Sequence, residues 1–150
     1  AGSQPCAART GKELVRMMPR YMLDTDILSY VIRGTNPKLN RKVASKAGRL
    51  CMSSITYHEL LYGARMRGSQ RIESVIDVLA EMVPVVDFSD AAADQAAAIR
   101  AALDLSGRTI GVMDALIAAT AKVERCILVT NNTNHFSRID GLSIENWAAP

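Results

Sequence analysis

Short, wholly apolar runs that alternate with longer helical segments are the feature of this sequence that most restricts its fold. Runs this short and uniformly apolar are typical of strands that are buried on both faces of a parallel sheet, with helices in the crossovers. The sequence therefore predicts an α/β domain with a central parallel sheet of about four to five strands, flanked by helices. The expected strands lie at about residues 20–23, 50–52, 83–86, 127–129 and 142–144.

The segments between these runs carry helix start and stop signals. Thr25 or Asp26 can cap a helix that Gly34 ends, and Pro37 can begin a basic helix that stops before Gly48. Further helices are expected at about residues 55–68, 69–82, 90–105 and 112–124. Residues 1–18 lack apolar periodicity and are interpreted as a leader, tag or disordered extension, which leaves 19–150 as one domain.

Composition agrees with a globular chain. The sequence has 150 residues, of which 49% are hydrophobic, enough for one continuous core. No apolar run reaches the roughly 18 residues of a membrane span, and no signal peptide is visible, so a soluble, cytoplasmic protein is expected. The three cysteines, Cys6, Cys51 and Cys126, form no C-x-x-C pair, which favours buried thiols over a zinc site.

Positive charge is concentrated in one part of the chain. The net charge is only +3, but between Ile27 and Ile72 the sole acid is Glu59. Such a cluster can be an ordinary solvated basic face or a binding surface for a polyanion, and the charge alone favours neither. The cluster of acids described next favours the polyanionic partner. The basic residues are Arg33, Lys38, Arg41, Lys42, Lys46, Arg49, Arg65, Arg67 and Arg71.

Four acids, Asp24, Asp26, Glu59 and Asp114, lie where apolar runs end or helices begin. Ligands of parallel sheets gather at the carboxyl ends of the strands, where Asp24 and the segment 130–132 are expected. Buried carboxylates are costly unless a positive charge compensates them, so several acids at one place imply a divalent cation. Such a cation on a basic surface points to phosphodiester chemistry.

Each of these acids also has a local explanation. Asp24 and Asp26 flank a helix cap, and Asp114 can stabilise a helix dipole. Thr56-x-x-Glu59 has the spacing of a capping box, and the local pattern alone favours that role for Glu59. His58 and His135 are too far apart in the sequence to indicate a zinc or acid–base site.

Four blocks in order give the chain a family resemblance. The blocks are MLDTDILSYVIRG (22–34), SSITYHELLYGA (53–64), GVMDALIAATA (111–121) and LVTNNTNHFSRIDGL (128–142). Together they resemble the PIN-domain ribonucleases, and among those the VapC-type toxins of bacterial toxin–antitoxin pairs. The resemblance covers about residues 20–147 and implies a three-layer PIN fold, a carboxylate-bound Mg²⁺ or Mn²⁺ and endonucleolytic cleavage of RNA.

Residue by residue, the family acids fall on Asp24, Glu59 and Asp114, so the resemblance overrides the capping interpretation of Glu59. The fourth position, often Asp, is Asn132 here, and His135 stands where many relatives have an acid before Phe. These departures leave one carboxylate fewer, which counts against a second tightly held metal.

The resemblance implies roles for these residues. Asp24 and Asp114 would hold the metal, Glu59 would act through a water, and Asn132 would complete the catalytic set. A homodimer and a small VapB-like antitoxin are expected partners. The TNN-x-x-x-F-x-R-I-x-G-L pattern resembles an enteric-like subgroup, for which the tRNA anticodon stem-loop, possibly of initiator tRNA, is the favoured target. The side chains expected to grip RNA are Arg33, Lys38, Arg41, Lys42, Lys46, Arg65 and Arg67.

Two alternatives remain open at this point. MLDTDIL also resembles the D-x-D strand end of haloacid-dehalogenase-type phosphohydrolases, although Leu28 stands where that family has Thr or Val, and neither its downstream Lys nor its acidic pair is visible. A non-catalytic PIN module that only binds RNA or an antitoxin is suggested by the missing fourth acid.

Overall fold

A central parallel sheet separates two groups of helices in the computed structural model, which describes residue 8 and residues 10–150. Five strands pair in the order β3-β2-β1-β4-β5, and every pairing is parallel. The strands are β1 (Tyr21–Leu23), β2 (Leu50–Ser53), β3 (Val85–Val86), β4 (Ile127–Val129) and β5 (Ile144–Glu145). The predicted α/β sheet, including its strand number, is confirmed.

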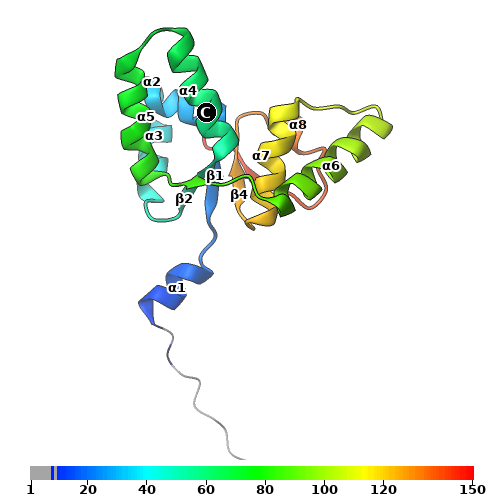
Figure 1. Cartoon of the computed structure of the whole chain (residues 1–150). Coiled ribbons are helices and arrows are strands. Elements are labelled where there is room, and N and C mark those ends of the chain that lie inside the picture. The colour runs from blue at the N-terminus through cyan, green and yellow to red at the C-terminus, as the bar shows by residue number, and fades with distance from the viewer. Residues whose placement is uncertain (1–7, 9) are drawn as a thin grey trace, which may run out of the picture.

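Helices connect the strands and cover both faces of the sheet (Figure 1). The helices are α1 (Gly11–Met17), α2 (Thr25–Arg33), α3 (Pro37–Ser45), α4 (Ser54–Met66), α5 (Gln70–Met82), α6 (Asp90–Leu105), α7 (Val112–Val123) and α8 (Thr133–Phe136). None of them, within the described residues, is long and apolar enough to cross a membrane.

Two apolar clusters fill the spaces on either side of the sheet. One joins β1 and β2 to α2, α3, α4 and α5 through residues such as Ile27, Leu39 and Ile76. The other joins the sheet to α6 and α7, where Ala96, Ala118 and Ala119 are buried. Small side chains let α6 and α7 approach closely. The resulting three layers bring the carboxyl ends of β1 and β4 to one edge.

The two free cysteines that the structure describes, Cys51 and Cys126, are both buried in the α6–α7 cluster. Their Sγ atoms are 3.8 Å apart. The prediction of buried thiols is therefore confirmed for these two, whereas Cys6 lies outside the described residues.

Helix capping differs from the sequence-based expectation in two places. Asp24, rather than Thr25 or Asp26, caps α2, because its Oδ1 accepts the Ile27 N–H at 2.9 Å. Ser53 caps α4 by accepting the Ile55 N–H at 3.1 Å, so the capping box predicted for Glu59 does not form. Both carboxylates therefore sit differently from the local pattern, and the carboxylate of Glu59 is free to face another helix.

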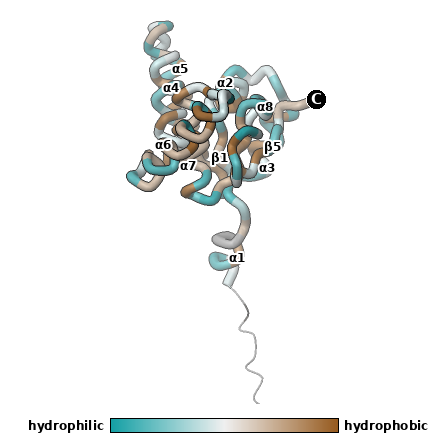
Figure 2. Tube along the Cα trace, turned by 90° about the vertical axis from the view of Figure 1, so that its right-hand side faces the viewer, coloured by the Kyte–Doolittle hydropathy of each residue, from teal (hydrophilic) through white to brown (hydrophobic). Residues whose placement is uncertain are grey.

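Helix α1 was not predicted from the sequence. Thr10 and Glu13 form a reciprocal capping box, with Thr10 N–H to Glu13 Oε2 at 2.7 Å and Glu13 N–H to Thr10 Oγ1 at 3.3 Å. Figures 1 and 2 show α1 set apart from the layered domain, below the start of β1. The assignment of residues 1–18 as a leader or tag stays a prediction, and residues 1–7 and 9 lie outside the described part.

Candidate active site

Asp24 occupies the carboxyl end of the central strand β1 and is only 5% exposed. Burial raises the pKa of its carboxyl from 3.8 to about 6, because a charge without water is costly. Hydrogen bonds from the Thr130 side chain and the Ile27 N–H oppose that rise, while the negative charges of Asp26 and Asp114 add to it. Burial therefore destabilises the ionised form of Asp24, and the two hydrogen bonds from Thr130 and Ile27 partly offset this cost.

Asp114 lies in the first turn of α7, the helix whose buried apolar side chains pack against the sheet. Burial raises the pKa of its carboxyl, and the neighbouring His135 counteracts this effect. The charge of Asp26 again raises the pKa. The charge of Asp114 raises the pKa of Asp24, and the charge of Asp26 raises the pKa of both. These three acids therefore interact electrostatically at the edge of the sheet.

Glu59 on α4 contacts Thr25, the first residue of α2. The Thr25 hydroxyl donates to Glu59 Oε1 at 2.6 Å, and the Thr25 and Thr56 hydroxyl oxygens are 3.3 Å apart. Thr25 follows Asp24 directly in the chain, so its hydroxyl ties the second family acid to the residue next to the first. Sequence reasoning missed this role for Thr25, and nothing in the local pattern distinguishes it from an ordinary first-turn threonine.

Thr130 is a second side chain that sequence reasoning left without a role. It is fully buried after β4, hydrogen-bonds Asp24, and accepts the Asn132 N–H at 2.9 Å. Its position directly after the apolar run 127–129, at the same sheet edge as Asp24, was the available signal. Thr130 therefore both fixes the loop and orients the Asp24 carboxylate.

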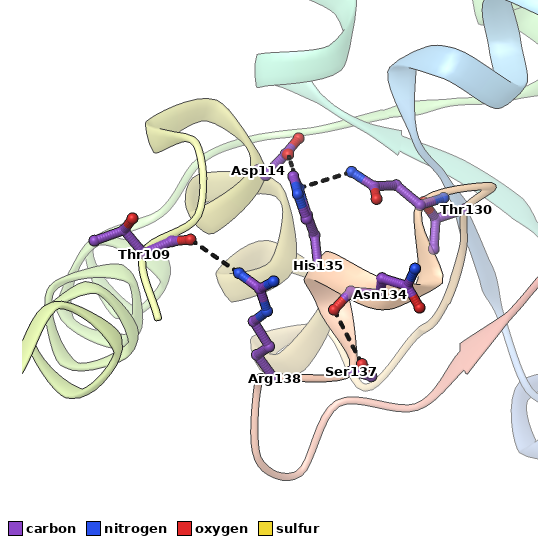
Figure 3. A network of polar contacts seen from close by, with 8 residues as sticks. Thr109, Asp114, Thr130, Asn134, His135, Ser137 and Arg138 are labelled. Carbon is purple, nitrogen blue, oxygen red and sulfur yellow. Dashed lines mark hydrogen bonds and ion pairs between the residues drawn. The ribbon is translucent and has the colours of Figure 1, made fainter. Parts of the chain in front are cut away.

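Asn132 faces His135 rather than the carboxylates. Its Nδ2 lies 2.8 Å from His135 Nδ1, which is 3.9 Å from Asp114 Oδ2. Figure 3 shows His135 directed from α8 toward Asp114 on α7. Where many relatives carry acids, this chain thus presents an amide, Asn132, that contacts an imidazole, His135, and the imidazole in turn lies near the third family acid.

The described residues contain no group of three or more His, Cys, Asp or Glu side chains arranged to hold a metal ion. The donor chemistry nevertheless fits a hard cation, since Asp24 and Asp114 are partly desolvated carboxylates whose negative charges oppose each other. Mg²⁺ usually keeps several waters and needs only one or two protein carboxylates. Two acids of this kind can therefore hold such an ion.

The seven predicted RNA-binding residues lie on or directly after α2, α3 and α4, and their contact with RNA stays a prediction. Arg33 and Arg67 line a groove between α2, α4 and α5 that also contains Glu59. Lys38, Arg41 and Lys42 line a pocket with Trp147 beside α3. The Nζ atom of Lys46 lies 5.4 Å from the ring centroid of Tyr21, and Arg65 pairs with Glu73 on α5.

Comparison with known proteins assigns this chain to a family. The family model of the PIN domain matches residues 21–142, most of the chain. The chain therefore belongs to the PIN-domain family.

Its curated relatives narrow the assignment. The chain is 36% identical over 132 residues to the tRNA(fMet)-specific endonuclease VapC of Shigella flexneri, covering 87% of this chain and 100% of that protein. It is 38% identical over 131 residues to ribonuclease VapC2 of Haemophilus influenzae, covering 87% and 99%. Within the PIN-domain family, the chain is thus a member of the VapC group.

Solved structures agree with this assignment. The chain superposes on a structure of DNA-bound VapBC from Salmonella typhimurium with a TM-score of 0.82 and 34% identity, covering 87% of this chain and 99% of that one. VapBC2 from Rickettsia felis, bound to a promoter DNA fragment, gives a TM-score of 0.79 and 33% identity, covering 85% and 98%. The predicted PIN-like fold is confirmed.

Proposed function

We propose that this protein is a metal-dependent endoribonuclease toxin that cuts tRNA and is neutralised by a VapB-like antitoxin. The observation that carries the proposal is the pair of desolvated, mutually repelling carboxylates, Asp24 and Asp114, at the carboxyl edge of the sheet. The PIN family and the ribonuclease names of the relatives favour this function over a haloacid-dehalogenase-type phosphohydrolase. They also favour it over a module that only binds.

Asp24 and Asp114 would hold one Mg²⁺ or Mn²⁺. When bound, such an ion polarises a phosphate and makes water more acidic. Side chains and a backbone N–H of the protein position the acids around this ion. Thr130 and the Ile27 N–H fix the Asp24 carboxylate, and Thr25 fixes Glu59, whose free oxygen can orient the attacking water or accept its proton.

The substrate that the relatives suggest is initiator tRNA, since two of them are named tRNA(fMet)-specific endonucleases. This chain contributes cations on several surfaces around α2, α3 and α4 that suit an RNA backbone. Sequence-specific RNA recognition usually targets unpaired loop bases. We therefore place the cut in the anticodon stem-loop.

The partner proposal rests on the neighbouring structures. Those from Salmonella typhimurium, Rickettsia felis and Haemophilus influenzae are described as VapBC, a toxin with its antitoxin. A VapB-like chain is accordingly the proposed inhibitor, together with a homodimeric toxin. Co-purification with the product of an adjacent short reading frame, followed by mass measurement in solution, tests both assignments.

Cleavage is expected to require an added divalent cation. Purified full-length protein should cut initiator tRNA in Mg²⁺ or Mn²⁺, lose this activity in excess EDTA, and regain it when either ion is restored. Products are read by sequencing RNA 5′ ends, with elongator methionine tRNA as the matched substrate control. Full activity after rigorous chelation would contradict the metal proposal, and intact tRNA under all conditions would contradict the nuclease proposal.

The Thr25 hydroxyl is expected to act as a positioning group for Glu59. Thr25→Val keeps the side-chain shape but removes the donor at 2.6 Å, so kcat should fall roughly 10-fold or more with little change in KM. Thr25→Ser restores the hydroxyl and should recover most of the activity. A loss of kcat in both variants, or in neither, would show that this hydrogen bond has no catalytic importance.

A further inference from the structure

A second cationic pocket lies on the side of the sheet opposite the predicted RNA-binding residues. It is a cavity of about 190 Å³ between α6, α7 and the segment after α8. Its rim carries the cations Arg108, Lys122 and Arg138, together with Asp140. The sequence did not draw attention to these cations, because they come from three separate segments.

The three cations have no carboxylate partner among the ion pairs of the described residues. Lys122 Nζ donates to the Asp140 carbonyl at 3.0 Å, and Arg138 Nη1 donates to the Thr109 carbonyl at 3.2 Å. Arg108 Nε makes only a long bond of 3.4 Å to Ser106 Oγ. Carbonyl oxygens orient these side chains without neutralising them, so the pocket keeps an excess of positive charge over the single Asp140 carboxylate.

The floor of the pocket has a different chemistry from its rim. Ile99, Leu103 and Ile139 are buried in the α6–α7 cluster, and Gln95 supplies an amide at the side. Guanidinium groups bind phosphate oxygens through paired N–H donors. An apolar floor beneath cations and an amide therefore suits one unpaired nucleotide, with its phosphate beside the cations.

The pocket adjoins the carboxylate site. Arg138 follows His135 by three residues, and His135 contacts Asp114. The carbonyl that holds Arg138 belongs to Thr109, in the loop that leads into α7, and α7 carries Asp114 in its first turn (Figure 3). An RNA strand at the carboxylates can thus continue over the α6–α7 side of the sheet.

We propose that this pocket, lined by Arg108, Lys122 and Arg138 over Ile99 and Ile139, binds one nucleotide of the RNA substrate outside the scissile bond. The proposal rests on the nuclease function proposed above. The pocket would be a second binding site for the RNA, on the side of the sheet opposite the cations of α2, α3 and α4. The chemistry recognised is a phosphate with its attached base.

The test measures RNA binding by full-length protein made inactive by Asp24→Asn. Affinity for initiator tRNA is measured from low to physiological salt for this parent and for Arg108→Gln and Arg138→Gln added to it. Each pocket variant should reduce the slope of log K against log salt by about 1, as expected for one lost phosphate contact. Arg100→Gln removes an exposed cation of α6 that does not line the pocket, and should leave the slope unchanged.

Arg108 is exposed, and among the described residues its side chain hydrogen-bonds only the Ser106 hydroxyl, so its variant should fold like the parent. Equal slopes for parent and both pocket variants, while the wild-type chain cuts tRNA, would overturn the pocket and leave the nuclease proposal standing. If the wild type neither binds nor cuts RNA, the proposed function and the pocket both fail.

A separate titration with inorganic phosphate and with CMP identifies the source of the ligand. An RNA site predicts weak binding of CMP that both pocket variants reduce, together with the change in salt slope. Binding of free phosphate or CMP without any effect of the variants on RNA binding would instead show a small-anion site, and would overturn the proposal.

Discussion

Asp24→Asn is expected to reduce tRNA cleavage on the order of 10³-fold and, at the same time, to make the protein more stable. The loss of activity follows because an amide oxygen binds a hard cation far more weakly than a carboxylate does. The gain in stability follows from burial, since Asp24 is 5% exposed and its pKa is raised to about 6.

The pH dependence fixes the sign of the stability change. The folded carboxyl binds its proton more tightly than the unfolded one, whose pKa is near 3.8, so ionising Asp24 costs about 3 kcal/mol of folding free energy. This cost is absent below about pH 4, grows as the pH rises toward 6, and is complete above it. The asparagine variant never ionises, and its Oδ1 can still accept the Ile27 N–H that caps α2.

Thermal melts in metal-free buffer measure this effect. At pH 7.5 the Tm of Asp24→Asn should exceed that of the wild type by about 5–10 °C, and the two curves should converge near pH 4. Asp104→Asn, an exposed acid of α6, is the matched control and should change neither the Tm nor cleavage. A lower Tm at pH 7.5 would show that the ionised Asp24 is not costly, and wild-type cleavage would remove it from the catalytic set.

The sheet and its acidic edge could be predicted because they depend on local patterns. Each short apolar run forms a strand, and Asp24 follows one such run directly, so parallel pairing alone brings it to the edge where ligands gather. The partner of Glu59 could not be predicted in this way. Thr25 lies 34 positions away, and the nearby Thr56 offered a capping-box alternative, which fails because Ser53 caps α4 and Thr56 lies inside the helix.

The arrangement of the basic residues in space could not be predicted from the sequence. Residues 33–71 contain nine Lys or Arg residues and one acid, Glu59, which predicted a basic region that could bind RNA. Because α2, α3, α4 and α5 turn their apolar faces to a common core, the charges are distributed over separate grooves. The pocket of Arg108, Lys122 and Arg138 arises in the reverse manner, since tertiary packing brings together cations that the sequence keeps apart.

Asp114→Asn is expected to abolish toxicity in a bacterial host without unfolding the protein. Asp114 is one of the two proposed metal-holding acids, and its partial burial raises its pKa, so the neutral amide should fit the first turn of α7 without strain. Induction of the wild-type chain should stop growth, whereas the variant should allow growth close to that of an empty vector. In vitro cleavage should fall about 10²-fold or more.

The matched control is Asp94→Asn, an exposed acid in the middle of α6, which should remain as toxic as the wild type. A Tm no lower than that of the wild type, together with equal tRNA affinity, shows for Asp114→Asn that only chemistry has been lost. If the variant arrested growth as strongly as the wild type, and both bound tRNA without cutting it, toxicity would come from RNA binding alone. The protein would then be a non-catalytic PIN module in which the carboxylate pair has no chemical role. RNA binding by cations does not require two acids that repel each other at the edge of the sheet.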